Sequence, residues 1–213
     1  MIRGSTLALA AALAASLTLG GCITLFPKAA PVQLYRFGDA PPATEVKGAR
    51  PAPFNLQRSA TLFTRPAQSD AILSSNGTET AYVSGARWVA PAVVLFDEAV
   101  GRAFDAPGEP ARVTPRGETG LSGLMLKLDV QTFEANYAAG KDAAPTVVVR
   151  VRGLLTKSAD RSVVAEKTFE SKQPADANRI GSIVHAFDAA TDEVIGQIVA
   201  WTDTEAAGVV PAA

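Results

Sequence analysis

The chain of 213 residues contains one cysteine and one histidine. A single cysteine excludes a framework of disulfide bonds, and one cysteine with one histidine is too few ligands for a Cys/His zinc site. An excess of charge of one sign is missing too, because 20 lysine and arginine residues stand against 21 aspartate and glutamate residues. This balance gives no electrostatic reason to expect a nucleic-acid partner.

Charged residues make up only 19% of the chain, whereas 47% of its residues are hydrophobic. A chain of this composition can bury enough apolar surface to fold, which excludes intrinsic disorder. Its length fits one globular domain, or at most two small ones.

The N-terminus has the pattern of a secretory signal peptide. Arg3 is the only charged residue before Lys28, and residues 6–19 form an unbroken apolar run. A basic start, an apolar stretch of about 7–15 residues and small residues at the cleavage point describe such a signal. The run is too short for a transmembrane helix, which needs about 20 apolar residues. No other segment approaches that length, so we expect the mature chain not to span a membrane.

Cys22 directly follows this run, in the sequence Leu-Gly-Gly-Cys. These residues resemble the bacterial lipoprotein signal, in which the cysteine thiol is acylated and becomes the first mature residue. The alternative is an incidental cysteine behind an ordinary signal peptide, but a lone free thiol is unusual in an exported protein. Several acyl chains on one residue would give stable membrane anchoring. Ile23 follows the cysteine where an aspartate resembles an inner-membrane retention signal, which favours the periplasmic face of the outer membrane.

We expect four segments along the chain: a signal peptide at 1–21, a lipidated tether at 22–31, a folded domain at 32–203 and a flexible tail at 204–213. Within the domain, runs of alternating or β-branched residues predict strands. These are expected at 32–37, 54–65, 71–75, 80–84, 112–114, 124–131, 146–155 and 163–169.

Two features of these strands predict their pairing. Asn76-Gly77 suits the left-handed backbone of a tight turn, so 71–75 and 80–84 are expected to form a hairpin. The last three strands follow one another across short turns, and we expect them to form an antiparallel meander.

Apolar residues at three- and four-residue spacing predict two amphipathic helices, at 87–104 and 176–201. Pro91 fits the first turn of the first helix, and Asp176 or Asn178 can cap the second. The expected fold is a single α/β (α+β) domain, in which a largely antiparallel or mixed β-sheet carries the two helices.

The search for catalytic residues gives little. His185 is the only imidazole, with Ser182 and Asp188 three residues to either side. Three neighbours on one helix do not form a catalytic triad, because the base must reach both partners within a concave site. Asp188 and Asp192 stand at i, i+4 spacing, and we interpret them as a solvated pair.

Three glycines, at 117, 120 and 123, resemble a phosphate-binding loop. No Lys-Ser/Thr pair follows them, and a strand comes next where a phosphate cradle needs a helix N-terminus. The sequence thus predicts a protein without enzymatic activity, metal ion or cofactor.

Arg87-Trp88 is the most informative pair of neighbours. An arginine beside an indole can clamp an acidic group or stack at an interface. The alternative is that Trp88 covers the edge of the core. Together with Tyr82, these two residues are the candidates for a partner-binding surface.

Several segments together resemble the ABC-type transport auxiliary lipoprotein family, whose members include the lipoprotein component of the Pqi intermembrane transport system. The most specific part is Tyr82 followed by Ala86-Arg87-Trp88-x-x-Pro91 and an amphipathic helix. Residues 38–65 match more loosely. The other matching segments are Cys22, Tyr35-x-Phe37, the strands at 124–133 and 147–155, the strand ending at Phe169, and the closing helix with Ala186-Phe187-x-x-Ala190 and Ile198-Val199-x-Trp201.

The resemblance implies a non-enzymatic periplasmic lipoprotein that holds the outer-membrane end of a transport bridge. Its partners would be an ABC permease and ATPase and a protein of the mammalian-cell-entry type, which carries lipids between the membranes. The alternative is an envelope lipoprotein that serves cell-wall synthesis or outer-membrane assembly. An envelope hydrolase would require a deep polar pocket with two or more carboxylates.

Overall fold

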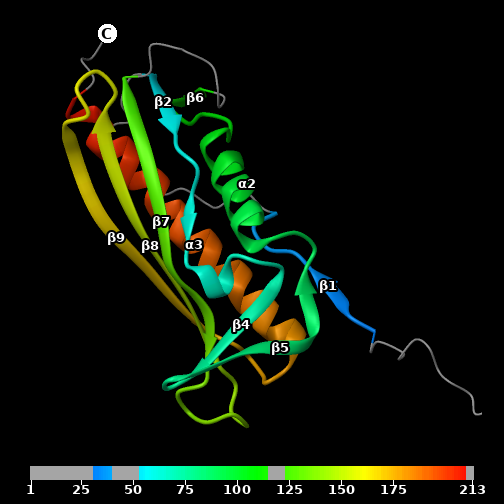
Figure 1. Ribbon diagram of the computed structural model, residues 1–213. Helices are drawn as coiled ribbons and strands as arrows, with labels where there is room; N and C mark the ends of the chain where they lie inside the picture. Colours follow the sequence, from blue (N-terminus) through cyan, green and yellow to red (C-terminus); the bar gives the residue numbers. More distant parts are fainter. Residues whose placement is uncertain (1–30, 40–52, 115–122, 210–213) are drawn as a thin grey trace, which may run out of the picture. The chain divides into compact units, whose positions relative to one another are not determined.

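The computed structural model describes residues 31–39, 53–114 and 123–209, which hold a mixed β-sheet of nine strands, two α-helices and one short 3-10 helix (Figure 1). The predicted α/β class is confirmed, whereas the signal peptide, Cys22 and most of the tether lie outside the described residues. The strands are β1 (Gln33–Tyr35), β2 (Phe54–Arg58), β3 (Leu62–Phe63), β4 (Ala71–Asn76), β5 (Glu79–Trp88), β6 (Ala111–Thr114), β7 (Leu124–Asn136), β8 (Thr146–Lys157) and β9 (Val163–Pro174). The helices are η1 (Arg65–Ala67), α2 (Ala92–Phe104) and α3 (Ile180–Ala207).

β7 is the central strand of the sheet. Along one side it pairs antiparallel with β8, from Leu124 opposite Lys157 to Asn136 opposite Thr146, and β8 pairs antiparallel with β9. The predicted meander is therefore confirmed. Every second residue of β7 from Leu124 to Val130 is buried, as alternation along a strand requires.

The other side of β7 is covered by three short parallel strands in succession, β2, β3 and β4. The single strand expected at 54–65 is therefore wrong, because strand pairing stops after Arg58. Polar contacts with α2 explain the break. Arg58 forms a 2.9 Å ion pair with Oδ1 of Asp97, and the Thr61 hydroxyl donates a 2.8 Å hydrogen bond to the same oxygen.

β4 and β5 form the predicted hairpin, with the turn at Asn76-Gly77, where Gly77 has a φ of +60°. β5 continues beyond the hairpin to Trp88 and pairs there, in parallel, with β1. β1 thus ends the arm of the sheet that runs from β7 through β4 and β5, and β9 ends the arm that runs through β8.

The first long helix, α2, starts after Pro91 and not at residue 87. Arg87 and Trp88 extend β5 because their backbone is engaged in the sheet. Both residues pair with β1, and the Trp88 amide donates a 2.7 Å hydrogen bond to the Asp70 carbonyl. Pro91 is accordingly the N-cap residue, one position before the first turn.

The start of α3 also differs from the prediction. The helix begins at Ile180, without a side-chain capping bond, so neither Asp176 nor Asn178 caps it. The Asn178 side chain is used elsewhere, because its oxygen accepts a hydrogen bond from the Tyr137 hydroxyl and its nitrogen donates one to the Lys141 carbonyl.

At its other end α3 is longer than predicted. It continues to Ala207 instead of stopping at Trp201, and Ala206 is fully buried. The first residues of the tail expected at 204–213 are thus helical, and residues 210–213 lie outside the described part. No helix in the described ranges is both long and apolar enough to cross a membrane.

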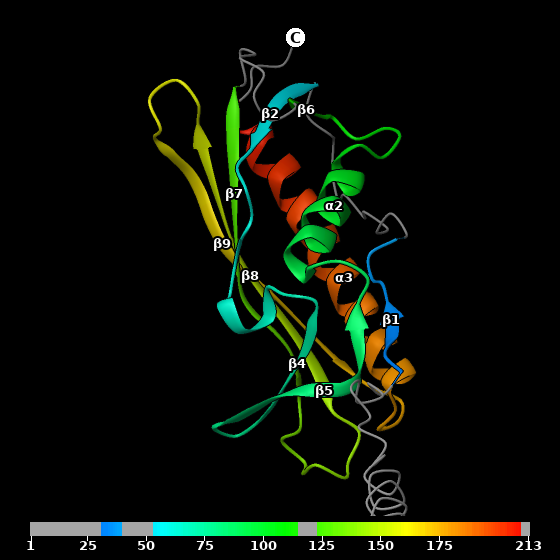
Figure 2. The same cartoon turned by 45° about the vertical axis from the view of Figure 1, so that its right-hand side comes forward.

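Both α-helices cover the same face of the sheet (Figure 2). The hydrophobic core lies between this layer of helices and the sheet. An aromatic cluster holds the layers together. Trp88 packs edge-on against Phe37, with 4.9 Å between ring centroids, and against Phe187, at 5.3 Å. Phe133 of β7 lies 4.9 Å from Phe187. Edge-on and tilted pairs of this kind are favoured by the charge distribution of the rings.

Gly38 connects the segment after β1 to both α-helices. Its φ is +69°, and an added Cβ would lie 2.7 Å from the Cβ of Ala99 on α2, so only glycine fits. The Gly38 amide donates a 2.6 Å hydrogen bond to the Asp188 carboxylate of α3. Its carbonyl accepts a 2.5 Å hydrogen bond from the Arg102 guanidinium of α2.

Candidate functional site

The α3 residues considered for a catalytic triad do not form a catalytic site. His185 is exposed on α3, whereas Asp188 accepts the hydrogen bond from the Gly38 amide and so joins α3 to the segment after β1. Within the described residues, no group of three or more histidine, cysteine, aspartate and glutamate side chains is placed to hold a metal ion.

The interpretation of Asp188 and Asp192 as a solvated pair is wrong. Asp192 is half-buried, and its Oδ1 has no hydrogen-bond partner among the described residues. Burial, and then the neighbouring Asp188 carboxylate, raises the pKa of Asp192 to about 6, against the opposing effect of Arg102. Both carboxyl groups therefore belong to the polar contact between α2, α3 and Gly38.

The glycine-rich segment does not form a phosphate cradle at its C-terminal end. Gly123 directly precedes β7, so a strand and not a helix N-terminus follows it. Glycines 117 and 120 lie outside the described residues.

Trp88 lies in the core, which corrects its predicted place in a partner-binding surface. It is 2% exposed and belongs to the aromatic cluster. Alternation along β5 gives the reason, because Arg87, one residue earlier, points to the opposite side and is exposed. The alternative interpretation, that Trp88 covers the edge of the core, was right about its structural role, but Trp88 lies within the core, among Phe37, Phe133 and Phe187.

Tyr82 and Arg87 lie on the surface together with apolar side chains that the sequence analysis did not single out. Leu34 of β1 is 63% exposed, and Val32, Tyr82 and Val89 are each about half exposed. The register places Leu34 beside Arg87. We call Val32, Leu34, Tyr82, Arg87 and Val89 the edge surface. Exposed apolar residues that gather in this way mark interaction sites, whereas single ones are ordinary.

The edge surface contains a hollow of about 290 Å³ whose lining includes Val32, Tyr82 and Arg87. It forms because β5 bends away from β4. Leu73 of β4 pairs with Tyr82, and Ala71 pairs with Arg87. Only Ile72 lies between the two β4 residues, whereas four residues of β5 lie between Tyr82 and Arg87 and form a bulge. Gly85, with a φ of +73°, permits this bend, because a positive φ suits glycine and few other residues.

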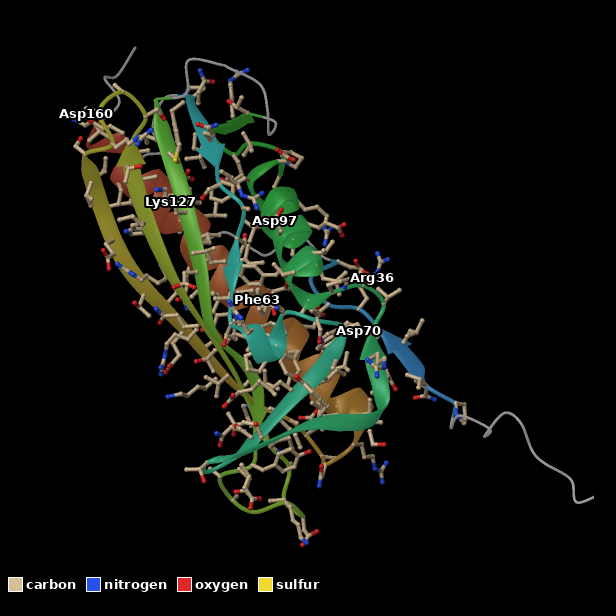
Figure 3. All side chains as sticks on the ribbon, in the orientation of Figure 1. Arg36, Phe63, Asp70, Asp97, Lys127 and Asp160 are labelled. Carbon is tan, nitrogen blue, oxygen red and sulfur yellow. The ribbon has the colours of Figure 1, made fainter. Side chains whose placement is uncertain are left out.

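Two polar contacts fix the walls of the hollow. Nη1 of Arg87 lies 2.9 Å from Oδ1 of Asp70, which is labelled in Figure 3. The Tyr82 hydroxyl donates a 3.1 Å hydrogen bond to the Pro66 carbonyl. Because the two members of the ion pair are half exposed, the pair adds little stability. It does orient the guanidinium, whose other N–H groups remain donors for an acidic group of a ligand.

The chain was compared with known proteins. Residues 35–199 match the family described as the ABC-type transport auxiliary lipoprotein component. No curated protein shows significant sequence similarity to the chain. The crystal structure of protein XCC0632 from Xanthomonas campestris is similar, with a TM-score of 0.70 and 26% identity over 82% of this chain and 96% of that one.

Protein CT253 from Chlamydia trachomatis has a TM-score of 0.51 and 9% identity over 75% of this chain and 100% of its own, which shows likeness of fold alone. The family match, by contrast, extends from β1 to the C-terminal half of α3, and so includes both arms of the sheet and the edge surface from Tyr82 to Val89. This chain therefore belongs to the ABC-type transport auxiliary lipoprotein family and is an auxiliary lipoprotein component of an ABC-type transport system.

Proposed function

We propose that this protein is anchored to the periplasmic face of the outer membrane and assists a mammalian-cell-entry-type system that moves phospholipid between the membranes. It has no catalytic step of its own in this proposal, since the ATPase of the system supplies the energy. The observation that carries the proposal is the family match of residues 35–199, downstream of a lone cysteine in a lipoprotein signal sequence.

Acylation of Cys22 would hold the domain close to one membrane. Nine residues lie between Cys22 and Val32, and the ten Cα–Cα steps that they create span at most about 35 Å. Stable anchoring requires more than one lipid chain, which the diacylglycerol thioether and a further acyl group on Cys22 would provide.

The edge surface is the proposed contact with the mammalian-cell-entry-type protein. Leu34 and Val32 offer apolar area next to the hollow, and the oriented Arg87 offers hydrogen-bond donors to an acidic group. Tyr82 and Arg87 belong to the residue types that dominate protein interfaces.

The test uses the full-length chain in its own host, with Cys22→Ser as the variant. The native protein should fractionate with membranes, carry an acylated N-terminal cysteine by mass spectrometry, and recover the permease, the ATPase or the mammalian-cell-entry-type protein on affinity purification. Cys22→Ser should move to the soluble periplasmic fraction. Recovery of cell-wall synthases or outer-membrane assembly proteins in place of transporter components would support the alternative function and overturn this one.

A further inference from the structure

A second hollow lies on the face of the sheet that is turned away from the helices. Its volume is about 370 Å³, within the range of about 300–1,000 Å³ that is usual for small-molecule sites. We call it the open-face groove and define it by Ala60, Leu62, Lys127, Asp129 and Leu154.

The apolar walls of the groove follow from the local fold. β3 alternates, so that Phe63 points inward to Phe96, at 6.0 Å between ring centroids, and Leu62 points outward. At 65% exposure, Leu62 is the most exposed large apolar side chain of the described residues. Leu62 lies on one side of β7, and Leu154 of β8 lies on the other side. Both leucines border the same hollow, which therefore offers an apolar path across β7.

The charges between these leucines are of opposite sign. Lys127 is directly opposite Leu154, and Asp129 is directly opposite Arg152. Arg152 is engaged by Glu166, at 2.7 Å, whereas Lys127 takes part in no ion pair of the described residues. Two positions along a strand correspond to about 7 Å. The groove thus presents an ammonium and a carboxylate side by side on an apolar floor.

We propose that the open-face groove binds one phospholipid with a zwitterionic headgroup. An acyl chain lies across β7 from Leu62 to Leu154, the Lys127 ammonium donates hydrogen bonds to the phosphate, and the Asp129 carboxylate accepts hydrogen bonds from the headgroup amine. Arg152 also lines the hollow, opposite Asp129. A purely anionic lipid would offer no amine to Asp129, and free phosphate would leave the leucines uncovered. The inference rests on the proposed function for the supply of lipid, and gives this chain a direct part in its handling.

Photo-crosslinking in intact cells tests the site with the full-length lipoprotein. Leu62→p-benzoylphenylalanine places the probe in the groove, and Val163→p-benzoylphenylalanine is the matched control, because Val163 is 63% exposed and lies outside it. Cells are labelled with radioactive phosphate before irradiation. A diacylglycerol anchor carries no phosphorus, so the label on the protein reports only a bound phospholipid.

We expect labelled adduct at position 62 in about tenfold excess over position 163. Lys127→Gln should lower the position-62 adduct by about tenfold, because a hydrogen bond from a charged group to the phosphate is lost. Lys167→Gln, on β9, is the matched charge control and should leave the yield unchanged. Thermal unfolding of each variant shows whether the fold is kept, which the high exposure of both probe positions favours.

Equal labelling at positions 62 and 163 would overturn the proposal, and so would a position-62 adduct that contains protein without phosphorus, since a protein partner would then cover the groove. The experiment distinguishes failure of the groove proposal from failure of the proposed function. A labelled adduct at position 62 without any co-purifying transport component would sustain the groove and refute the function. Co-purifying components without labelled adduct would do the reverse.

Discussion

Two of the edge strands of the sheet, β1 and β9, are built in opposite ways. β9 is twelve residues long and exposes charged side chains, among them Glu166, Lys167 and Lys172. β1 is three residues long, with Leu34 exposed within it and Val32 exposed just before it. An edge strand is a template for pairing with another chain, and charged residues, lysine above all, oppose such pairing. The contrast predicts that β9 resists association with another chain, whereas β1 suits the contact proposed above.

The charges at β9 are arranged in pairs with β8. Glu170 binds both Lys172 and Arg150, which lowers the pKa of its carboxyl group, and the hydrogen bond from Arg152 likewise lowers the pKa of Glu166. Exposed pairs of this kind contribute little to stability. Their effect is on association, because any strand that approached β9 would have to accommodate these charges.

Below the surface the two edges are alike. A buried tryptophan supports each of them. Trp88 is the last residue of β5 and pairs with β1. Trp201 of α3 lies beneath β8 and β9, where it packs edge-on against Phe169 at 5.4 Å between centroids. The two edges therefore share an aromatic support and differ in strand length and outer side chains, so core and surface substitutions should have different effects.

The largest effect is expected for Trp88→Ala. Removal of a fully packed aromatic side chain should lower the free energy of unfolding by about 3–5 kcal/mol, as measured by denaturant unfolding. Tyr82→Ala, at the exposed face of the same strand, is the control and should lower it by less than about 1 kcal/mol. A stable Trp88→Ala protein would contradict the assignment of this residue to the core.

Gly153→Ala tests the packing beneath the β9 edge. The new Cβ would lie 3.1 Å from Cε2 of Phe169 and 3.1 Å from Cζ3 of Trp201. Because both rings are buried, overpacking should lower the free energy of unfolding by about 1–3 kcal/mol. Gly181→Ala, in the first turn of α3 with open space at its Cβ, is the control and should be neutral or stabilising. If the two variants had equal free energies of unfolding, the rings of Phe169 and Trp201 would be able to move away from the new methyl group without loss of stability.

Leu34→Glu and Val163→Glu compare the outer surfaces directly, because both side chains are 63% exposed. Leu34→Glu should reduce recovery of the transport partner by about tenfold, or about 1.4 kcal/mol, since a charge replaces an apolar contact. Val163→Glu should leave it unchanged. Neither should alter the free energy of unfolding by more than about 0.5 kcal/mol. If both variants lost the partner to the same extent, the proposal that the partner binds at β1 and not at β9 would be contradicted.

Asp192→Asn tests the contact of α2 and α3 with the segment after β1, and its effect should depend on pH. Because folding raises the pKa of Asp192 from 3.8 to about 6, the folded chain holds the proton more tightly. The contribution of this group to stability is therefore lost as pH rises through that interval and stays absent above it. With solvent screening, the variant should be about 1 kcal/mol more stable than the native protein at pH 7.5 and equally stable near pH 4.

Thermal unfolding at the two pH values measures this difference. Glu79→Gln, at an exposed position of β5, is the control for the removal of one carboxylate. A native-like pH profile for Asp192→Asn would contradict the raised pKa.

Some elements could be predicted from the sequence because their signal is local. The alternation of β7 and the Asn76-Gly77 turn are set by neighbours within a few residues, and both were confirmed. The start of α2 was wrong because Arg87 and Trp88 pair with β1, whose residues lie more than fifty positions earlier. A helical spacing pattern cannot reveal such a partner.

In the candidate surfaces too, some residues could be predicted from a local motif, whereas others are exposed only because of the tertiary fold. Tyr82 and Arg87 were found through a motif, whereas Leu34, Leu62 and Leu154 were not. Apolar residues in strands are ordinarily interpreted as core. Their exposure depends on which face of each strand the helices cover and on where the chain leaves the sheet, as it does after Arg58.

The sequence by itself determined that strands alternate with two amphipathic helices, and it predicts a lipoprotein signal that ends at Cys22 and a lack of the residues of common catalytic and zinc sites. Those properties are carried by composition, by short motifs and by local periodicity. Only the tertiary structure decided that Trp88 is buried while Leu34 and Leu62 are exposed, and that one edge of the sheet is charged and the other apolar. The physical reason is that burial depends on pairing and packing between residues far apart in the chain, which local periodicity does not record.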